Sequence, residues 1–272
     1  MRAKSVVAVA LAMAACALTA PRADAATAYS LYSYDLSQTS GSIVANGAAA
    51  FTAVPLQLIG TWSPTPTGVY FTGDQTSQGS VGKAKPNTGS TINVAETKSV
   101  GVAIRFTYTA PVAGCFSDSP NLTQIGRFGN NVAQVKLQLS NCGISKTAVY
   151  PQCRVAGSQT PTSVWPRKSS VALVDGTTYV VHCMEGVTTT GTRTFILRVT
   201  PLGSATTTNQ WTVPSPGAIT STSALSVANK YPLPSGSANT DQYVGEVQKV
   251  AYCMAGTPGL ISGCLSTEIP TS

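Results

Sequence analysis

The chain is poor in charged and titratable side chains. Only 10% of its 272 residues are charged, and histidine occurs once, as His182. A serine or cysteine nucleophile normally needs a neighbouring base, most often histidine, and zinc sites usually combine several closely spaced Cys and His ligands. The sequence also has no Cys-x-x-Cys, Gly-x-Ser-x-Gly or P-loop motif. Nucleophilic catalysis, zinc binding and nucleotide binding are therefore disfavoured, and His182 is expected to be a structural residue that faces out of its strand if Cys183 faces in.

Basic side chains are in excess but do not cluster. The formal charge is +7, and no basic run is longer than Arg167-Lys168. Nucleic-acid binding normally needs a clustered basic face, so no nucleic-acid partner is expected. A mild positive charge is compatible with an anionic polysaccharide or a cell surface, and equally with solubility alone.

The first 25 residues have the pattern of an export signal. A positive start is followed by an apolar run too short to span a bilayer, and then by a small-x-small cleavage sequence before Ala26. Cys16 offers the alternative of a lipid anchor. No other apolar run approaches the ~20 residues of a membrane-spanning helix. We therefore expect residues 1–25 to be a signal peptide and the protein to be secreted, with residues 26–272 as a single domain carrying N-terminal and C-terminal extensions.

Seven cysteines occur, and removal of Cys16 with the signal leaves six. An even number in an exported chain indicates disulfides, although six cysteines allow fifteen pairings. Pairing of sequence neighbours suits a meander in which consecutive strands lie side by side. We therefore expect staples across neighbouring strands at Cys115–Cys142, Cys153–Cys183 and Cys253–Cys264.

Strand patterns recur along the chain, whereas helical periodicity is nearly absent. Apolar and smaller residues alternate over 100–108, and 134–140 alternates polar with apolar side chains without a break. In the second run, Val135, Leu137 and Leu139 should face a core, and the polar set should face solvent or a groove. Turn sequences such as Asp175-Gly176 separate the strands. Segment 203–226 is rich in Thr, Ser and Pro and is expected to run over the surface.

Several of these segments resemble a known family. They are Asn121-Leu-Thr-Gln-Ile-Gly-Arg-Phe-Gly, Gln134-Val-Lys-Leu-Gln-Leu, Gln152-Cys-Arg-Val-Ala-Gly, Asp175-Gly-Thr-Thr-Tyr-Val-Val-His-Cys and Tyr243-Val-Gly-Glu-Val. Together they resemble secreted bacterial laminin G-like domains of the concanavalin A-like lectin/glucanase superfamily. The resemblance implies an all-β, two-sheet antiparallel jelly-roll sandwich. The chain departs from the family pattern at Thr178–Tyr179, where Trp-His is usual, and at Gln248, where Asp is usual.

The resemblance implies non-catalytic recognition of an extracellular glycan or a surface protein. The glucanase branch needs a Glu-x-Asp-x-x-Glu strand that brings two carboxyl groups about 5 Å apart, and this chain has none. A degenerate glycan-cleaving enzyme and a structural envelope or matrix protein remain as alternatives. The candidate ligand-binding residues are Trp165, Tyr231, Tyr243 and Arg167. Laminin G-like domains often bind calcium at one rim, for which the candidate ligands here are Asp118 and Asp241.

Overall fold

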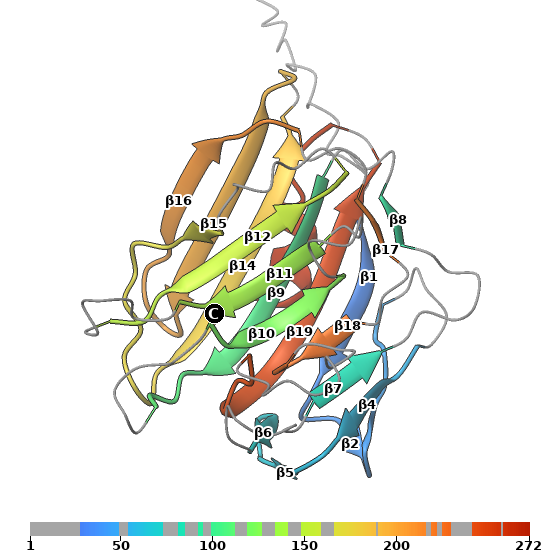
Figure 1. Ribbon diagram of the computed structural model, residues 1–272, viewed down its shortest axis with the longest axis vertical. Helices are drawn as coiled ribbons and strands as arrows, with labels where there is room; N and C mark the ends of the chain where they lie inside the picture. Colours follow the sequence, from blue (N-terminus) through green and yellow to red (C-terminus); the bar gives the residue numbers. More distant parts are fainter. Residues whose placement is uncertain are drawn as a thin grey trace, which may run out of the picture.

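Two antiparallel β-sheets face each other and form a sandwich (Figure 1). The computed structural model describes residues 28–48, 54–72, 81–84, 92–94, 99–111, 119–126, 134–140, 148–158, 166–188, 190–215, 219–221, 225–229, 241–256 and 258–272. The all-β jelly-roll-like architecture expected from the strand patterns is confirmed. The expected signal peptide, with Cys16, lies outside the described residues.

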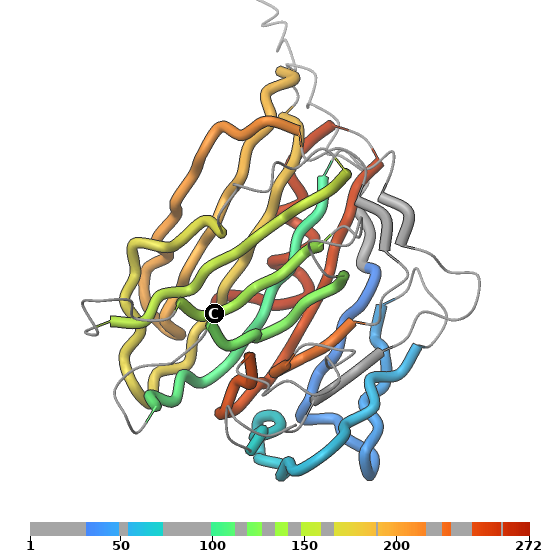
Figure 2. The backbone as a smooth tube through the Cα atoms, viewed as in Figure 1, coloured from blue at the N-terminus to red at the C-terminus, as the bar shows by residue number. Residues whose placement is uncertain are grey.

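The eight-stranded sheet carries the longest strands. Its order is β16 (Thr207–Thr212), β15 (Arg193–Pro201), β14 (Thr178–Val187), β9 (Ser99–Thr107), β19 (Gly245–Ala255), β6 (Val69–Phe71) and β5 (Trp62–Pro64), and β1 (Ala28–Asp35) also pairs with β19. The central strands come from distant parts of the sequence, since β9 lies between β14 and β19 (Figure 2).

The nine-stranded sheet lies in front in Figure 1. Its order is β13 (Arg167–Lys168), β12 (Pro151–Ala156), β11 (Gln134–Leu139), β10 (Asn121–Ile125), β18 (Leu225–Val227), β7 (Val81–Ala84), β4 (Leu56–Ile59), β3 (Ile43–Val44) and β2 (Thr39–Ser40). A separate pair joins β17 (Ile219–Ser221) to β8 (Ile92–Val94). Segment 203–226, expected to run over the surface, includes β16, β17 and the start of β18. Its residues 203–215 are exposed or half-buried, as expected of a surface segment, but pairing of β16 with β15 and of β18 with β10 gives it strands that the turn-rich composition did not predict.

The core between the sheets follows the alternation of the strands. Val102, Ile104 and Phe106 of β9 are fully buried, as are Leu137 and Leu139 of β11 on the opposite sheet. Burying such side chains stabilises a fold by about 1.5–3 kcal/mol each. The alternation of 134–140 therefore places its apolar set in the core, as predicted.

Direct ties join the two sheets, and a disulfide and a buried hydrogen bond are among them. The disulfide Cys153–Cys183 runs from β12 to β14, with the two Cα atoms 6.2 Å apart. The pair forms as expected, but it crosses the core between the sheets instead of stapling neighbouring strands, because its two strands belong to different layers. A hydrogen bond of 3.0 Å also joins the hydroxyls of Thr123 on β10 and Tyr252 on β19.

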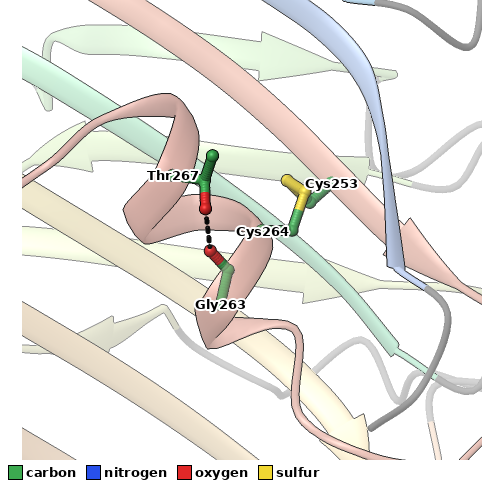
Figure 3. The surroundings of a disulfide bond; sticks show 4 residues. All are labelled: Cys253, Gly263, Cys264 and Thr267. Atoms are coloured by element: carbon green, nitrogen blue, oxygen red, sulfur yellow. Dashed lines mark hydrogen bonds between the residues drawn. A yellow bond between two sulfur atoms is a disulfide. The ribbon is translucent and has the colours of Figure 1, made fainter.

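A short helix, α1 (Ser262–Glu268), covers the far side of the eight-stranded sheet. The disulfide Cys253–Cys264 ties it to β19 (Figure 3). Leu265 and the flanking Ile261 and Ile269 are buried against a second apolar cluster that includes Val180 and Met184. The expected Cys115–Cys142 pair lies outside the described residues.

The helix also explains the position of His182. Cys183 faces the core, so His182 faces outward, as the alternation predicts. It is nevertheless only 1% exposed, because the C-terminal segment covers it. Its Nε2 lies 3.0 Å from the carbonyl oxygen of Ile269, which can only accept, so Nε2 carries a hydrogen and donates it. Burial lowers the pKa of this imidazole.

Candidate functional site

The outer face of the nine-stranded sheet is lined by polar side chains at one end. Strand register sets their positions: Lys136 lies opposite both Arg154 and Gln124, and Gln138 lies opposite Gln152. We call this set the polar face; its members are Gln124, Gln134, Lys136, Gln138, Tyr150, Gln152, Arg154 and Lys168. These side chains point away from the core because their neighbours along each strand, such as Val135 and Leu137, point into it.

Amide groups on the polar face are held by hydrogen bonds. Gln138 donates from Nε2 to Oε1 of Gln152 at 2.9 Å. Gln124 accepts from Asn121 at 3.0 Å and donates to the carbonyl of Gly126 at 3.3 Å. Gln124 and Gln138 are largely buried, with 3% and 6% of their surface exposed. These hydrogen bonds therefore fix the amides in orientation.

An aromatic side chain and a lysine meet at the edge of this face. Tyr150 directly precedes β12 and is half-buried. The ammonium group of the exposed Lys168 lies 3.9 Å from the centre of its ring, within the range of a cation–π contact. The contact fixes a flexible cation beside an aromatic ring.

Three cations occupy three adjacent strands of the polar face. Lys136 on β11 lies directly opposite Arg154 on β12, and Lys168 on β13 lies opposite Gln152, two residues from Arg154. Lys136 and Arg154 are half-buried. Desolvation lowers the pKa of the Arg154 guanidinium from its very high usual value, which leaves it a cation at neutral pH.

Most of the described carboxylates lie elsewhere. Asp35 pairs with Lys249 at 2.9 Å and Glu185 with Arg193 at 2.9 Å, both on the eight-stranded sheet. The remaining four are Asp175, Asp241, Glu246 and Glu268. Among them only Asp241 adjoins β10 of the nine-stranded sheet, where it is 8% exposed and accepts from Asn121 at 3.4 Å. Within the described residues, the polar face is therefore predominantly positive.

The ligand-binding residues predicted from sequence do not gather on this face. Tyr243 is completely buried, and its hydroxyl donates to the carbonyl of Thr107 at 2.6 Å. Its ring is therefore unavailable for stacking on a ligand, because it forms part of the core against Phe106. Arg167 faces inward, and its guanidinium lies 5.7 Å from the Trp211 ring. Trp165 and Tyr231 lie outside the described residues.

Of the two calcium ligands predicted from sequence, only Asp241 lies among the described residues, so the calcium site stays a prediction. Calcium takes six to eight oxygen ligands, several of them from carboxylates. Asp241 supplies one carboxylate, and its bonded neighbour Asn121 supplies an amide. Across the part of the chain that the structure describes, no three His, Cys, Asp or Glu side chains gather as a metal would require. The other candidate ligand, Asp118, lies outside the described residues.

Two further carboxylates have unusual surroundings. Burial raises the pKa of Glu185 to about 7, although its ion pair with Arg193 acts in the opposite direction. Glu246 is half-buried and accepts hydrogen bonds from Thr65, Thr67, Thr107 and Gln248, which together hold its pKa below the usual range against the effect of burial. Glu185 shares the inner face of the eight-stranded sheet with Cys183, whereas Glu246 lies on the outer face, so the two do not converge.

Reasoning from sequence missed five members of the polar face, which are Gln124, Tyr150, Gln152, Arg154 and Lys168. The alternation of 134–140 was a usable signal, because it assigned Gln134, Lys136 and Gln138 to solvent or a groove. The missing step was the register of β12 against β11, which adds Gln152 and Arg154 to the same side.

Comparisons with known proteins place the chain by fold. No known protein family matches the sequence, and no curated protein is similar to it. The binding domain of botulinum neurotoxin DC, solved in complex with rat synaptotagmin II, matches 90% of this chain with a TM-score of 0.51 and 8% identity. The binding domain of serotype G matches 88% with a TM-score of 0.50 and 7% identity. The chain covers 52% and 50% of those two chains, about half of their length.

A weaker likeness links the chain to an alginate lyase of polysaccharide lyase family 14 from Aplysia kurodai. It has a TM-score of 0.38 and 8% identity, over 78% of this chain and 85% of the other. The two neurotoxin comparisons show that the chain shares a β-sandwich fold with toxin binding domains. Among the described residues, no helix is long and apolar enough to cross a membrane.

Proposed function

We propose that the chain is a secreted, non-catalytic recognition module that binds an extracellular glycan on the polar face. The observation that carries the proposal is the ordered set of amides, cations and one aromatic ring on the outer side of the nine-stranded sheet. Amides such as those of Gln138 and Gln152 can both donate to and accept from sugar hydroxyls. Tyr150 adds an apolar surface beside them.

A recognition role is supported over catalysis by the placement of the carboxylates. A retaining or inverting glycosidase needs two carboxyl groups that flank one bond. Glu185 and Glu246 lie on opposite sides of the eight-stranded sheet, and Glu185 is 3% exposed and paired with Arg193. The two disulfides among the described residues are of the kind that persists in an oxidising, extracellular setting.

A glycan array with the chain from Ala26 onward tests the proposal. We expect binding to a subset of glycans, lost in the double variant Tyr150→Ala/Gln152→Ala and kept in Gln210→Ala. Gln210 is an exposed glutamine on β16, at the edge of the other sheet, so it controls for the loss of an amide. Silence on every glycan refutes the proposal, and release of shorter oligosaccharides from a bound glycan refutes its non-catalytic part.

A surface protein is the second candidate partner. The observation in its favour is that the neurotoxin DC binding domain, of similar fold, was solved with synaptotagmin II bound. Loss of glycan binding from an otherwise folded chain, with retained binding to protease-sensitive sites on cells, would favour this second candidate.

A further inference from the structure

Strand β16 ends the eight-stranded sheet, at the left in Figure 1, and among the described residues it pairs with β15 alone. We infer that two copies of this chain pair antiparallel along β16 and form a two-fold dimer with one continuous sheet. The pairing itself does not depend on the proposed function, whereas its effect on glycan affinity rests on it.

The other end strands of the two large sheets are protected against such pairing. Proteins protect edge strands by shortness, charge, proline, irregular register or a covering segment. Strands β2 and β13 have two residues each, and both residues of β13 are basic, while β5 has three residues and ends at Pro64. Strand β1 shifts register between Ser30 and Tyr32, and Gly47 covers its edge by donating to the carbonyl of Ser33 at 2.7 Å.

Strand β16 shows none of these protections among the described residues. It has six residues, Thr207–Thr212, without a charge or a proline. Its register with β15 runs from end to end without a shift. Thr208, Gln210 and Thr212 are exposed. An edge of this kind is a template for pairing with another chain.

The hydrogen-bond pattern shows which residues of β16 point their backbone groups away from β15. Val213 donates to the carbonyl of Arg193 at 3.2 Å, directly beyond the end of the β15–β16 register. Because bonded and non-bonded pairs alternate along an antiparallel ladder, the odd-numbered residues of β16 bond to β15. The N–H and C=O groups of Thr208, Gln210 and Thr212 therefore point outward along the edge.

The sequence of this edge is self-complementary about Gln210. A two-fold axis between two opposed Gln210 residues places Thr208 opposite Thr212 of the second copy, and each such pair can exchange two backbone hydrogen bonds. These side chains lie on the outer face of the sheet, because Trp211 packs against the core. There the Gln210 amides can bond each other, and threonine lies opposite threonine, a pair that stabilises sheets. No like charges are opposed, because Thr207–Thr212 carries none.

The symmetry of this dimer determines where its polar faces point. Antiparallel pairing of two identical edges needs a two-fold axis perpendicular to the sheet, which keeps both nine-stranded sheets on the same side. The end of the polar face at β13 lies beside the shared edge, because Ser169 and Ser170 bond to the Asn209 side chain of β16 at 3.3 and 3.1 Å. Such a dimer can attach to two sites on one surface, which raises the apparent affinity without a new contact.

Sedimentation equilibrium of the purified protein tests the pairing. The area buried by one pair of strands is small, so we expect a weak dimer with a Kd of roughly 1–100 µM. A purely monomeric protein at about 500 µM overturns the inference, because such a Kd would leave most of the chain dimeric at that concentration. Assemblies larger than a dimer also overturn it, because a two-fold interface closes on itself.

Charge variants localise the interface. Gln210→Lys places two like charges opposite each other and should raise the Kd of the dimer at least roughly tenfold. Thr208→Lys/Thr212→Glu places opposite charges across the axis, so its Kd should stay within about threefold of the native value. Gln210→Ala keeps the backbone bonds and should keep most of the dimer.

Gln38→Lys is the matched control, because it makes the same change in the exposed turn after β1. It should leave the Kd of the dimer unchanged. An unchanged dimer in Gln210→Lys, or an equal loss in Gln38→Lys or in the double variant, overturns the inference. Urea unfolding of each variant verifies that it is folded.

Glycan binding separates this inference from the proposed function. The probe is a glycan identified on the array, used both as a soluble oligosaccharide and densely immobilised. We expect Gln210→Lys to bind the soluble form like the native chain and the immobilised form at least roughly tenfold more weakly. Equal binding of the two proteins to the immobilised form overturns the bivalent arrangement. A dimer that binds no glycan leaves the pairing standing and refutes the proposed function, and a monomer that binds glycans does the reverse.

Discussion

Glu185 should make the stability of the protein fall as pH rises through neutrality. Its carboxyl group is 3% exposed on the inner side of β14, and burial raises its pKa from 4.5 to about 7 in the folded chain. A carboxyl whose folded-state pKa is raised prefers to be protonated when folded. Its contribution is therefore fully present below about pH 4.5 and is lost as pH rises through about 7.

The size of the effect follows from the two pKa values. Each pKa unit corresponds to about 1.4 kcal/mol, so the gap between 4.5 and about 7 amounts to roughly 3 kcal/mol of unfolding free energy. The ion pair with Arg193 acts against burial, so Arg193→Gln should make the loss at high pH larger.

Urea unfolding of the oxidised protein at a series of pH values measures this effect. The informative quantity is the stability of the native sequence minus that of Glu185→Gln, because other titrating groups then cancel. We expect this difference to fall by roughly 3 kcal/mol between about pH 4 and pH 9. A pH-independent difference for Glu185→Gln would refute the assignment of a raised pKa.

Three further predictions concern the layers of the sandwich. Gly101→Ala should destabilise the protein by roughly 1–3 kcal/mol, because the added Cβ would lie 2.7 Å from the carbonyl oxygen of Cys183 and 2.9 Å from Ile261 Cδ1. Gly263→Ala, with nothing within 4 Å of its added Cβ, is the matched control, and equal urea midpoints for the two variants would contradict the prediction. Replacing Cys153 and Cys183 together by Ala removes a cross-link between residues 30 apart and should lower the unfolding free energy by about 4 kcal/mol. A loss below about 1 kcal/mol would contradict the expectation that this disulfide stabilises the sandwich. Burial lowers the pKa of His182, so this residue should lower stability as pH falls below the ordinary histidine pKa of 6.5. Identical acid unfolding profiles for the native chain and His182→Gln would disprove that.

Much of the fold could be predicted because strand alternation is a local property of the sequence. The run over 134–140 assigns Val135, Leu137 and Leu139 to the core without knowledge of any partner strand. Residue His182 shows the limit of the same reasoning. Its outward direction follows from alternation, but the layer that covers it, α1, could not be predicted.

The helix and the polar face depend on contacts that are distant in sequence. The seven residues of α1 include Ser262, Gly263 and Thr267, which are weak helix formers, so its stability comes from the Cys253–Cys264 bond and burial of Leu265. The polar face likewise becomes visible only when β12 is aligned against β11. Composition favours aromatic residues as ligand contacts, and it cannot distinguish core Tyr243 from half-buried Tyr150.

The links between the two sheets limit how far the polar face can change shape when a ligand binds. The sheet that carries the polar face is joined by the Cys153–Cys183 bond and the Thr123–Tyr252 contact to a second sheet, which is itself covered by α1. Such a surface has little freedom to reshape, so little conformational entropy remains to be lost on association. A rigid, preorganised surface of this kind selects polymers whose repeat already matches the strand spacing, and it discriminates against chains that would need it to adapt.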